Sequence, residues 1–251
     1  MIDIHNHILY GIDDGCSYFA DSLSLLKDGK NEGINTIVFT PHFIINGQYK
    51  EAKDKLIKRF ESFKKEVKQA NINIDMYLGQ ELFIHKDLDK MLAKAEVLTL
   101  ANSHYLLVEF PFDHYEDHYD EILYNLQIDG YRIIIAHPER YRYVINDPNF
   151  CLRWLDNDHL LQINQDSIVD SKNNLALKLI DKGFVAFVAS DAHNHMRPLS
   201  LKYAYQIVTD VFDESVANTL FEINPQMIID DQPIAKNNYQ AFTKGFFGSF
   251  K

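Results

Sequence analysis

The stretch YRIIIAHPER, residues 131–140, joins an unbroken apolar run to a cluster of polar and charged side chains. FVAFVAS at 184–190 is built in the same way and is followed by DAH at 191–193. A strand that is apolar on both faces is typical of a parallel sheet that helices cover on both sides. Both stretches therefore predict buried parallel strands whose carboxyl ends present reactive side chains.

Five other β-rich runs alternate along the chain with amphipathic segments; they are IDI (2–4), TIVFT (36–40), IDMYLGQE (74–81), YLLVEF (105–110) and LLQIN (160–164). Segments 19–33 and 51–70 repeat apolar residues every three or four positions, which predicts helices. No internal repeat, low-complexity segment or Pro/Gly/Ser-rich linker interrupts the pattern. We therefore expect a single domain over residues 1–251, in which 236–251 could form a tail.

Seven strands joined by helices can close into a distorted (β/α)7 TIM-like barrel or remain an open, doubly wound sheet. Six of the seven predicted strands end in polar motifs, which are DIHNH (3–7), TPH (40–42), GQE (79–81), VEF (108–110), HPER (137–140) and SDAH (190–193). In a barrel these ends form one ring, whereas an open sheet collects only the residues near its switch point. The motifs therefore favour a barrel.

The composition favours a globular protein and argues against several other classes. With 46% hydrophobic residues among 251, the chain can build a proper core, and its net charge of -11 argues against a nucleic-acid partner. Met1 leads directly into a predicted strand, and no apolar stretch approaches about eighteen residues, so we expect a cytoplasmic protein without a membrane span. Cys16 and Cys151 lack the arginine six positions later that a cysteine phosphatase needs, because Ser22 and Asn157 stand there.

Imidazoles and carboxylates recur at the predicted strand ends. His5 and His7 can face one centre, since alternate residues of a strand point the same way. This donor set without thiolate suits manganese, iron or zinc, and at about three to five ligands per ion it supports two or three ions, especially if Glu81 bridges two of them. The candidate ligands are His5, His7, Asp14, His42, Glu81, Glu109, His137, Asp191 and His193.

In this order and over nearly the whole chain, DIHNH, TPH, GQE, HPER and SDAH resemble the motifs of the polymerase and histidinol phosphatase (PHP) superfamily. The opening HILYGIDDG, with GQE, VEF and HPERY, resembles one branch of it, the bacterial metal-dependent protein-tyrosine phosphatases of capsular and extracellular polysaccharide operons. The resemblance implies a distorted seven-stranded barrel, the PHP fold, with a trinuclear metal site. More distant branches often have a histidine where this chain has Asp14.

The resemblance also implies how the ligands are divided among the ions. The implied sets are His5, His7, Glu81 and Asp191 for the first ion, Glu81, Glu109 and His137 for the second, and Asp14, His42 and His193 for the third. Asp13 is expected to orient its partner in the acidic pair rather than to bind an ion. Manganese is the expected metal, with iron, zinc and magnesium as alternatives.

Two arginines near the predicted ring, Arg140 in HPER and Arg197 after SDAH, stand where the family binds the substrate phosphate. A guanidinium can pair with two phosphate oxygens and stabilise the charge that develops in phosphoryl transfer. A loop salt bridge is the alternative for each, and the spacing around HNHMRP departs from relatives with a longer loop. Phe112 and Tyr115 are candidates for lining an aromatic substrate ring, with core or surface packing as the alternative.

The resemblance implies metal-assisted hydrolysis of phosphotyrosine monoesters, on a bacterial tyrosine kinase that regulates polysaccharide export. A phenolate, with a free pKa of about 10, leaves more readily than the alkoxide of serine, so aryl phosphates should be the better substrates. The alternatives are a small-molecule phosphatase such as one for histidinol phosphate, another PHP phosphoesterase, and a metal-binding regulatory module. The C-terminal KGFFGSFK, 244–251, could be a docking tail or a patch that closes the barrel.

Overall fold

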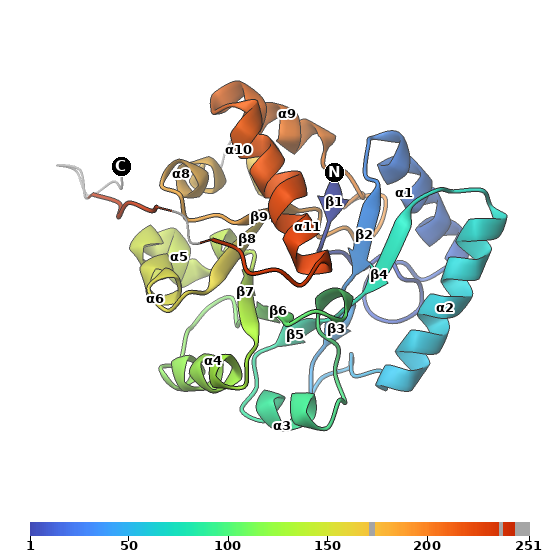
Figure 1. Cartoon of the computed structure of the whole chain (residues 1–251), viewed down its shortest axis with the longest axis horizontal. Coiled ribbons are helices and arrows are strands. Elements are labelled where there is room, and N and C mark those ends of the chain that lie inside the picture. The colour runs from blue at the N-terminus through green and yellow to red at the C-terminus, as the bar shows by residue number, and fades with distance from the viewer. Residues whose placement is uncertain (171–173, 236–237, 244–251) are drawn as a thin grey trace.

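The computed structural model describes residues 1–170, 174–235 and 238–243. Short strands lie at the centre of the molecule and helices lie around them (Figure 1). The described residues contain nine strands, which are β1 (Ile2–Asp3), β2 (Thr36–Phe39), β3 (His42–Phe43), β4 (Asp75–Leu78), β5 (Glu81–Phe83), β6 (Tyr105–Glu109), β7 (Arg132–Ala136), β8 (Leu160–Asn164) and β9 (Phe187–Ala189). All neighbouring strands pair in parallel, in the order β1-β2-β4 in one sheet and β3-β5-β6-β7-β8-β9 in the other. The predicted α/β class with parallel strands is confirmed.

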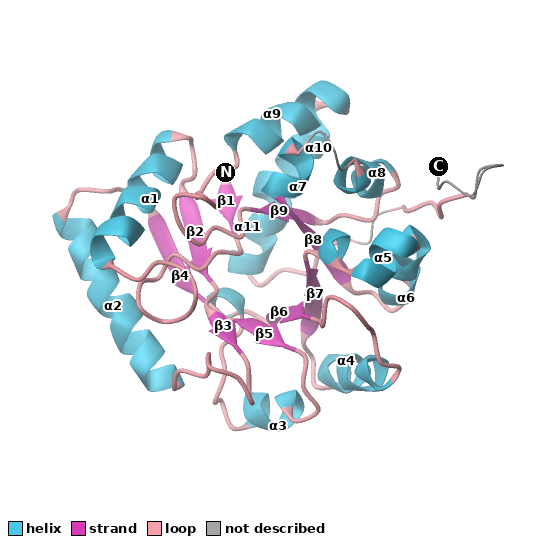
Figure 2. Ribbon diagram, turned by 180° about the vertical axis from the view of Figure 1, so that it is seen from behind, coloured by secondary structure: helices cyan, strands magenta, loops and turns pink. Residues whose placement is uncertain are grey.

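Helices flank the strands on opposite sides of the molecule. Figure 2 shows α1 and α2 beside β2 and β4, and α5 and α6 beside β8 on the other side. The bounds are α1 (Phe19–Asn31), α2 (Lys53–Gln69), α3 (Leu88–Ala93), α4 (His118–Ile128), α5 (Arg142–Asn146), α6 (Leu152–Leu155), α7 (Gln165–Val169), α8 (Leu175–Asp181), α9 (Lys202–Val211), α10 (Glu214–Asn218) and α11 (Asn224–Ile229). In the described ranges, every helix is too short or too polar to cross a lipid bilayer.

The two helices predicted at 19–33 and 51–70 are confirmed as α1 and α2. In α2 the buried residues recur every three or four positions, as Leu56, Phe60, Phe63 and Val67. The rings of Phe60 and Phe63 pack edge-on against Phe39 of β2, with centroids 5.8 and 5.7 Å apart. Aromatic packing therefore holds α2 against its sheet.

The run 74–81, predicted as one strand, is divided between the two sheets. β4 ends at Leu78 and pairs with β2, whereas Glu81 begins β5 and pairs with β3. At the break, a Cβ on Gly79 would lie 2.8 Å from Leu100 Cδ2 and 3.0 Å from its Cα, so a larger residue would require Leu100 to shift. Pro41 interrupts the preceding strand in the same region, since it has no N–H to donate to a ladder. Two of the predicted runs are thus each divided, so the described residues contain nine shorter strands and the count of seven is not confirmed.

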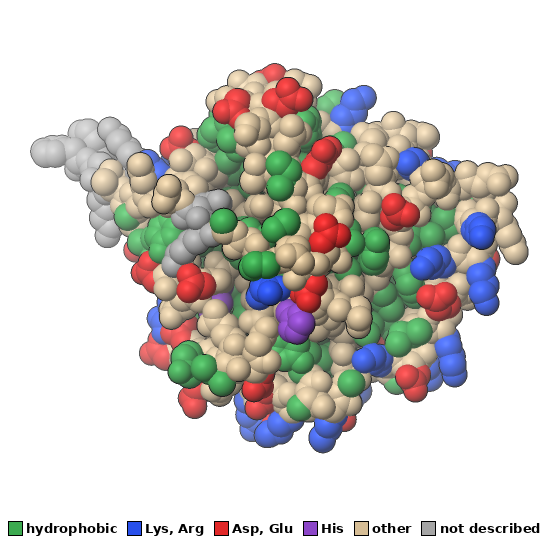
Figure 3. All heavy atoms as spheres, in the orientation of Figure 1, with side chains coloured by type: hydrophobic (Ala, Val, Ile, Leu, Met, Phe, Trp, Pro, Cys, Tyr) green, Lys and Arg blue, Asp and Glu red, His purple; other side chains and the backbone are tan. Residues whose placement is uncertain are grey.

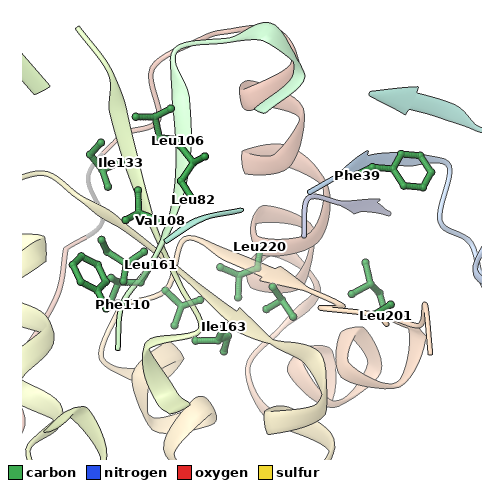
Figure 4. Packing of buried hydrophobic residues seen from close by; sticks show 14 of the residues in the cluster. Phe39, Leu82, Leu106, Val108, Phe110, Ile133, Leu161, Ile163, Leu201 and Leu220 are labelled. Atoms are coloured by element: carbon green, nitrogen blue, oxygen red, sulfur yellow. The ribbon is translucent and has the colours of Figure 1, made fainter. Parts of the chain in front are cut away.

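Two apolar clusters follow the alternation of side chains along the strands. The helix-facing cluster contains Leu106 and Val108 of β6, and Figure 4 shows both with Leu82, Ile133 and Leu161 of neighbouring strands. The inner cluster takes the alternate residues and comprises Ile2, Ile4, Val38, Leu100, Tyr105, Leu107, Ile134, Ala136, Ala186, Phe187, Ala189 and Ile228. Both faces of the strands are therefore buried, as their continuous apolar runs predict.

Backbone contacts also connect the two sheets. Asn6, beyond β1, forms a parallel bridge with Ala192, beyond β9, and His7 N donates to Ala192 O at 2.7 Å. On the other side, Glu81 N of β5 donates to Pro41 O at 3.2 Å. These bonds bring the carboxyl ends of strands from both sheets close together.

The described part of the predicted tail lies against the body of the protein. Phe242 N donates to Asn149 Oδ1 at 2.7 Å, and the Phe242 ring packs edge-on against Phe184. Phe242 itself is 4% exposed. The segment KGFFGSFK, 244–251, lies outside the described residues.

Candidate metal centre

The nine predicted ligands lie together at the carboxyl ends of the strands. Glu109 follows Tyr105 and Leu107 on the inner face of β6, and Asp191 continues the alternation of Phe187 and Ala189 after β9. The same strand face that is apolar at its amino end therefore presents donors at its carboxyl end. The donor atoms form four overlapping groups, each within 4.8 Å, which are His7, Asp14, His42 and His193; His5, His7 and Glu81; His5, His137 and Asp191; and His42, Glu81 and Glu109.

Glu81, the first residue of β5, lies at the centre of the cluster and is fully buried. Its Oε1 is 3.0 Å from His137 Nε2 and 3.2 Å from His5 Nε2. Its Oε2 is 2.8 Å from His42 Nδ1 and 3.5 Å from His7 Nε2. The two oxygens thus face different imidazoles, which is the arrangement a carboxylate needs to bridge two cations.

Asp191 joins the imidazoles to the two predicted arginines. Its Oδ1 is 3.5 Å from His5 Nε2 and 3.4 Å from His7 Nε2. Its Oδ2 accepts hydrogen bonds from Arg140 Nη1, at 3.0 Å, and from Arg197 Nη2. Both arginines therefore reach the centre, although each forms the carboxylate contact that was the alternative to phosphate binding.

The outer part of the cluster is more open than the inner part. Asp14 Oδ1 is 3.5 Å from His42 Nε2 and 3.7 Å from His193 Nε2. The Asp14 side chain is 48% exposed, whereas those of His5 and Glu81 are fully buried. Asp14, His42 and His193 thus form an outer group at the mouth of the site, and His7 lies within reach of it.

Several buried donor atoms in the cluster have no hydrogen-bond partner among the described residues. His42 Nδ1 and Glu81 Oε2 lie 2.8 Å apart but are not aligned for a hydrogen bond, and His137 Nδ1 is also without a partner. Buried polar atoms are normally satisfied, and an uncompensated one costs about 1–3 kcal/mol. Donors that aim at common points rather than at each other are what a set of metal ligands requires, so these residues fit divalent cations.

The charges of the cluster drive the pKa values of its two glutamates apart. Burial alone would raise the pKa of Glu81, but the neighbouring imidazoles of His5 and His42 outweigh it and hold that pKa well below its usual range. Burial and the charge of Glu81 raise the pKa of Glu109 well above its usual range. Two carboxylates forced together in this way are stabilised by a cation between them.

Three residues that support the candidate ligands were missed or underrated from the sequence. Gln162 Oε1 accepts a hydrogen bond from His5 Nδ1 at 2.8 Å, and Asn164 Nδ2 donates to Asp191 Oδ2 at 2.6 Å. Both lie on β8, the one predicted strand to which no polar end motif was assigned. Their alternation within LLQIN was the sequence signal that could have placed them on one face of the strand. Asp13 accepts from His7 Nδ1 at 2.8 Å, so it orients a histidine rather than Asp14.

The loop that carries Asp13 and Asp14 depends on a close backbone approach. A Cβ on Gly15 would lie 1.7 Å from His7 O, so no other residue fits without a shift of the backbone. Asp3, the last residue of β1, accepts hydrogen bonds at 2.8 Å from both Ser190 N and Ser190 Oγ. Asp3 therefore ties β1 to the end of β9.

Two aromatic rings flank the cluster. Phe112 stacks on His137 with centroids 5.7 Å apart, and the Arg140 guanidinium lies 4.9 Å from the centre of the Phe112 ring. Tyr49, from the loop after β3, stacks on His42 at 5.8 Å. Tyr115, in contrast, packs in an aromatic group with Trp154 and donates to Asp120, so its predicted alternative of packing holds.

The fold and this cluster together define a class of protein, a parallel α/β protein that gathers imidazoles, carboxylates and arginines at the carboxyl ends of its strands. A phosphotriesterase homology protein from Escherichia coli shares the fold alone, with a TM-score of 0.56 and 13% identity over 91% of this chain and 98% of that one. The chain belongs to the CpsB/CapC family of capsular polysaccharide synthesis, whose model matches residues 1–230.

Individual relatives cover almost the whole chain. It is 32% identical to the tyrosine-protein phosphatase YwqE of Bacillus subtilis, over 98% of this chain and 100% of that protein. It is 30% identical to the tyrosine-protein phosphatase CpsB of Streptococcus agalactiae, over 95% of this chain and 100% of that protein. A solved structure from work on YwqE and on CpsB of Streptococcus pneumoniae, described as unique metal-dependent tyrosine phosphatases, superposes with a TM-score of 0.91, 32% identity and coverage of 96% and 99%. The family resemblance read from the motifs is thus confirmed.

Proposed function

We propose that the chain is a metal-dependent protein-tyrosine phosphatase that hydrolyses phosphotyrosine monoesters. The observation that carries the proposal is the gathering of five histidines, four carboxylates and two arginines in one cluster at the carboxyl ends of the strands. Membership of the CpsB/CapC family and the tyrosine-protein phosphatases among its relatives support the same reaction.

The cluster would hold two or three divalent ions, with manganese as the first candidate. His5, His7, Glu81 and Asp191 would hold one ion; Glu81, Glu109 and His137 a second; and Asp14, His42 and His193 a third, with Glu81 shared. When bound, the ions supply Lewis acidity toward phosphoryl oxygens and lower the pKa of water near phosphorus. The contacts of Asp13 with His7 and of Gln162 with His5 keep the imidazoles oriented toward this task.

Arg140 and Arg197 are the residues we assign to the substrate phosphate. Their guanidinium groups both reach Asp191 Oδ2, and their side chains are 38% and 36% exposed, so each has donors left for a ligand. A guanidinium offers five donors in a planar fork that matches phosphate oxygens. The arginines would hold the phosphoryl group at the carboxyl ends of the strands and stabilise the charge that develops on it during transfer.

Phe112 and Tyr49 would form the walls that receive the phenyl ring of phosphotyrosine. They stack on His137 and His42, on different sides of Glu81, and Phe112 is 38% exposed. An aromatic wall favours an aryl leaving group over an alkyl one, since stacked rings gain about 0.5–1.5 kcal/mol beyond their burial. This arrangement favours phosphotyrosine over phosphoserine.

The protein substrate we propose is a bacterial tyrosine kinase that regulates capsular or extracellular polysaccharide synthesis. The phosphatase would act on this kinase in the cytoplasm. The description of the matching family as capsular polysaccharide synthesis supports this setting. We also infer that the two sheets form one closed, distorted (β/α)7 barrel of the PHP type and a single domain. The Asn6–Ala192 bridge and the bond from Glu81 N to Pro41 O, at the two junctions of the sheets, support closure.

The proposed function is tested by metal analysis of the purified protein, followed by chelation and restoration of manganese, iron, zinc or magnesium in the same sample. We expect phosphate release from a phosphotyrosine peptide to disappear on chelation and to return with metal. A protein that contains no divalent metal, or that stays fully active after chelation, would contradict the proposal.

The aromatic wall is tested with Phe112→Ala and the matched control Phe112→Tyr. We expect Phe112→Ala to lower kcat/KM for a phosphotyrosine peptide about fivefold more than for a phosphoserine peptide of the same sequence, as expected for about 1 kcal/mol of lost stacking. Phe112→Tyr should retain the preference. Equal losses on both peptides would show that Phe112 supports Arg140 without selecting the ring.

A further inference from the structure

The basic charge of this acidic protein gathers on α2. Its 17 residues, KDKLIKRFESFKKEVKQ, contain six lysines and Arg59 against Asp54, Glu61 and Glu66, whereas the whole chain has a net charge of -11. Figure 3 shows Lys and Arg side chains along the edge of the molecule that α2 occupies in Figure 1. An ordinary solvent-exposed helix face accounts for the charged residues on the last turns of α2. The first turns differ because they also line a groove.

A groove of about 370 Å³ lies between the first turns of α2 and the loop that follows β1. Lys55, Lys58 and Arg59 line it from the helix, and Tyr10 and Ile12 line it from the loop. The Arg59 guanidinium lies 4.6 Å from the centre of the Tyr10 ring, which holds this cation at the wall of the groove.

The loop that lines the groove also carries two residues of the metal cluster. Ile12 is followed directly by Asp13, which bonds His7, and by Asp14 of the outer group. Because α2 follows a strand, its first turn lies at the edge where the carboxyl ends of the strands meet. A peptide bound with its phosphotyrosine at the cluster can therefore extend its neighbouring residues along Tyr10 toward α2.

The cations in the groove are largely uncompensated. Among the described residues, neither Lys58 nor Arg59 forms an ion pair. Lys55 pairs with Glu51 at 3.3 Å, but these side chains are 74% and 34% exposed, so the pair is easily exchanged for another carboxylate. Glu51 also lines the groove and is its one carboxylate among the lining residues.

We propose that this groove docks acidic residues next to the phosphotyrosine of the protein substrate. The inference rests on the proposed function for the position of the phosphotyrosine. A chain of net charge -11 repels an acidic substrate over most of its surface, so a local group of cations beside the site both attracts and orients such a segment. Three cations in a short groove match a few carboxylates of a peptide, whereas nucleic acid requires an extended basic surface.

The test compares Lys55→Glu/Lys58→Glu with the matched control Lys65→Glu/Lys68→Glu, which makes the same charge change on the last turns of α2. The substrates are two phosphotyrosine peptides, one with Asp and Glu next to the phosphotyrosine and one with Ser and Gln there, and p-nitrophenyl phosphate. We expect the first variant to raise KM for the acidic peptide about fivefold with kcat unchanged. The neutral peptide and p-nitrophenyl phosphate should be turned over as by wild type, and the control should resemble wild type throughout.

Binding of the fluorescein-labelled acidic phosphopeptide, measured by anisotropy, separates this inference from the proposed function. If the protein binds the peptide in a manner that depends on Lys55 and Lys58 but releases no phosphate, docking stands and the proposed reaction fails. Equal loss of binding in the two variants, or equal loss for acidic and neutral peptides, would overturn docking at the groove. Loss of binding to vesicles of anionic phospholipid without any change for the peptide would overturn it in favour of a membrane surface.

Discussion

The two ends of the same strands carry opposite chemistry. At the amino ends, inner-face residues such as Tyr105, Ile134 and Phe187 form an apolar cluster that is fully buried. At the carboxyl ends, the same faces present Glu109 and Asp191, whose surroundings shift their pKa values strongly in opposite directions. The apolar end supplies the burial that stabilises the fold, so the other end can hold buried charges that no core would tolerate. The comparison predicts that stability and activity can be lost separately.

The largest expected effect is that of Asp191→Ala at the carboxyl end. This change removes a contact shared by His5, His7 and both arginines, and we expect kcat/KM for a phosphotyrosine peptide to fall at least about a thousandfold. Thermal unfolding should change little, because the apolar end is untouched. Activity near the wild-type level would remove Asp191 from the candidate centre.

The reverse loss is expected at the amino end. Ile134 is fully buried in the inner cluster, and Ile134→Ala should lower the free energy of unfolding by about 2–5 kcal/mol in urea titrations. The milder Ile134→Val should cost about 0.5–1.5 kcal/mol, and it keeps the test informative if the first variant does not fold. The folded protein should keep its kcat. A comparable loss of kcat in Ile134→Val would contradict the separation of the two ends.

Within the carboxyl end, the outer group should be less critical than the inner residues. Asp14 is half exposed, so Asp14→Ala should weaken metal affinity and lower activity about ten- to a hundredfold. Excess metal should restore part of the activity, because the buried ligands remain. Metal titrations of Asp14→Ala and of Asp191→Ala give the comparison, and a loss in Asp14→Ala as deep and as insensitive to metal as in Asp191→Ala would contradict it.

The smallest effect concerns a single imidazole just before β8, at the amino ends. His159 is 4% exposed, and burial lowers its pKa to about 4 from a usual value of 6.5. Between these values the unfolded chain binds a proton that the folded state excludes, so stability from this residue is present above pH 6.5 and is lost as pH falls toward 4.

His159→Gln should therefore reduce the drop in the free energy of unfolding between pH 7 and pH 5 by about 1–2 kcal/mol relative to wild type. Urea titrations of both chelated proteins at the two pH values measure this difference. Activity at pH 7 should be retained, since His159 does not contact the metal centre. An unchanged pH dependence would show that His159 protonates normally in the folded protein.

Much of the candidate site could be read from the sequence, because most of the candidate ligands end an apolar run or follow it within a few residues, and only Asp14 lies farther along, in the loop after the first run. HPER after RIIIA and DAH after FVAFVAS are local patterns, and parallel strands bring such endings to one edge. The strand count could not be read in this way. The break in 74–81 depends on the close approach of Gly79 to Leu100, which belongs to a distant segment.

The sequence by itself determined the α/β class, the nine donors, the two arginines and the family, since these depend on residue type and order along the chain. Only the tertiary structure decided that Asp13 supports His7, that Gln162 supports His5, and that Glu81 lies between four imidazoles. The groove between Tyr10 and α2 likewise exists only once the loop and the helix are packed together. The reason is that partners more than a few residues apart are chosen by strand register and loop packing, which no local pattern records.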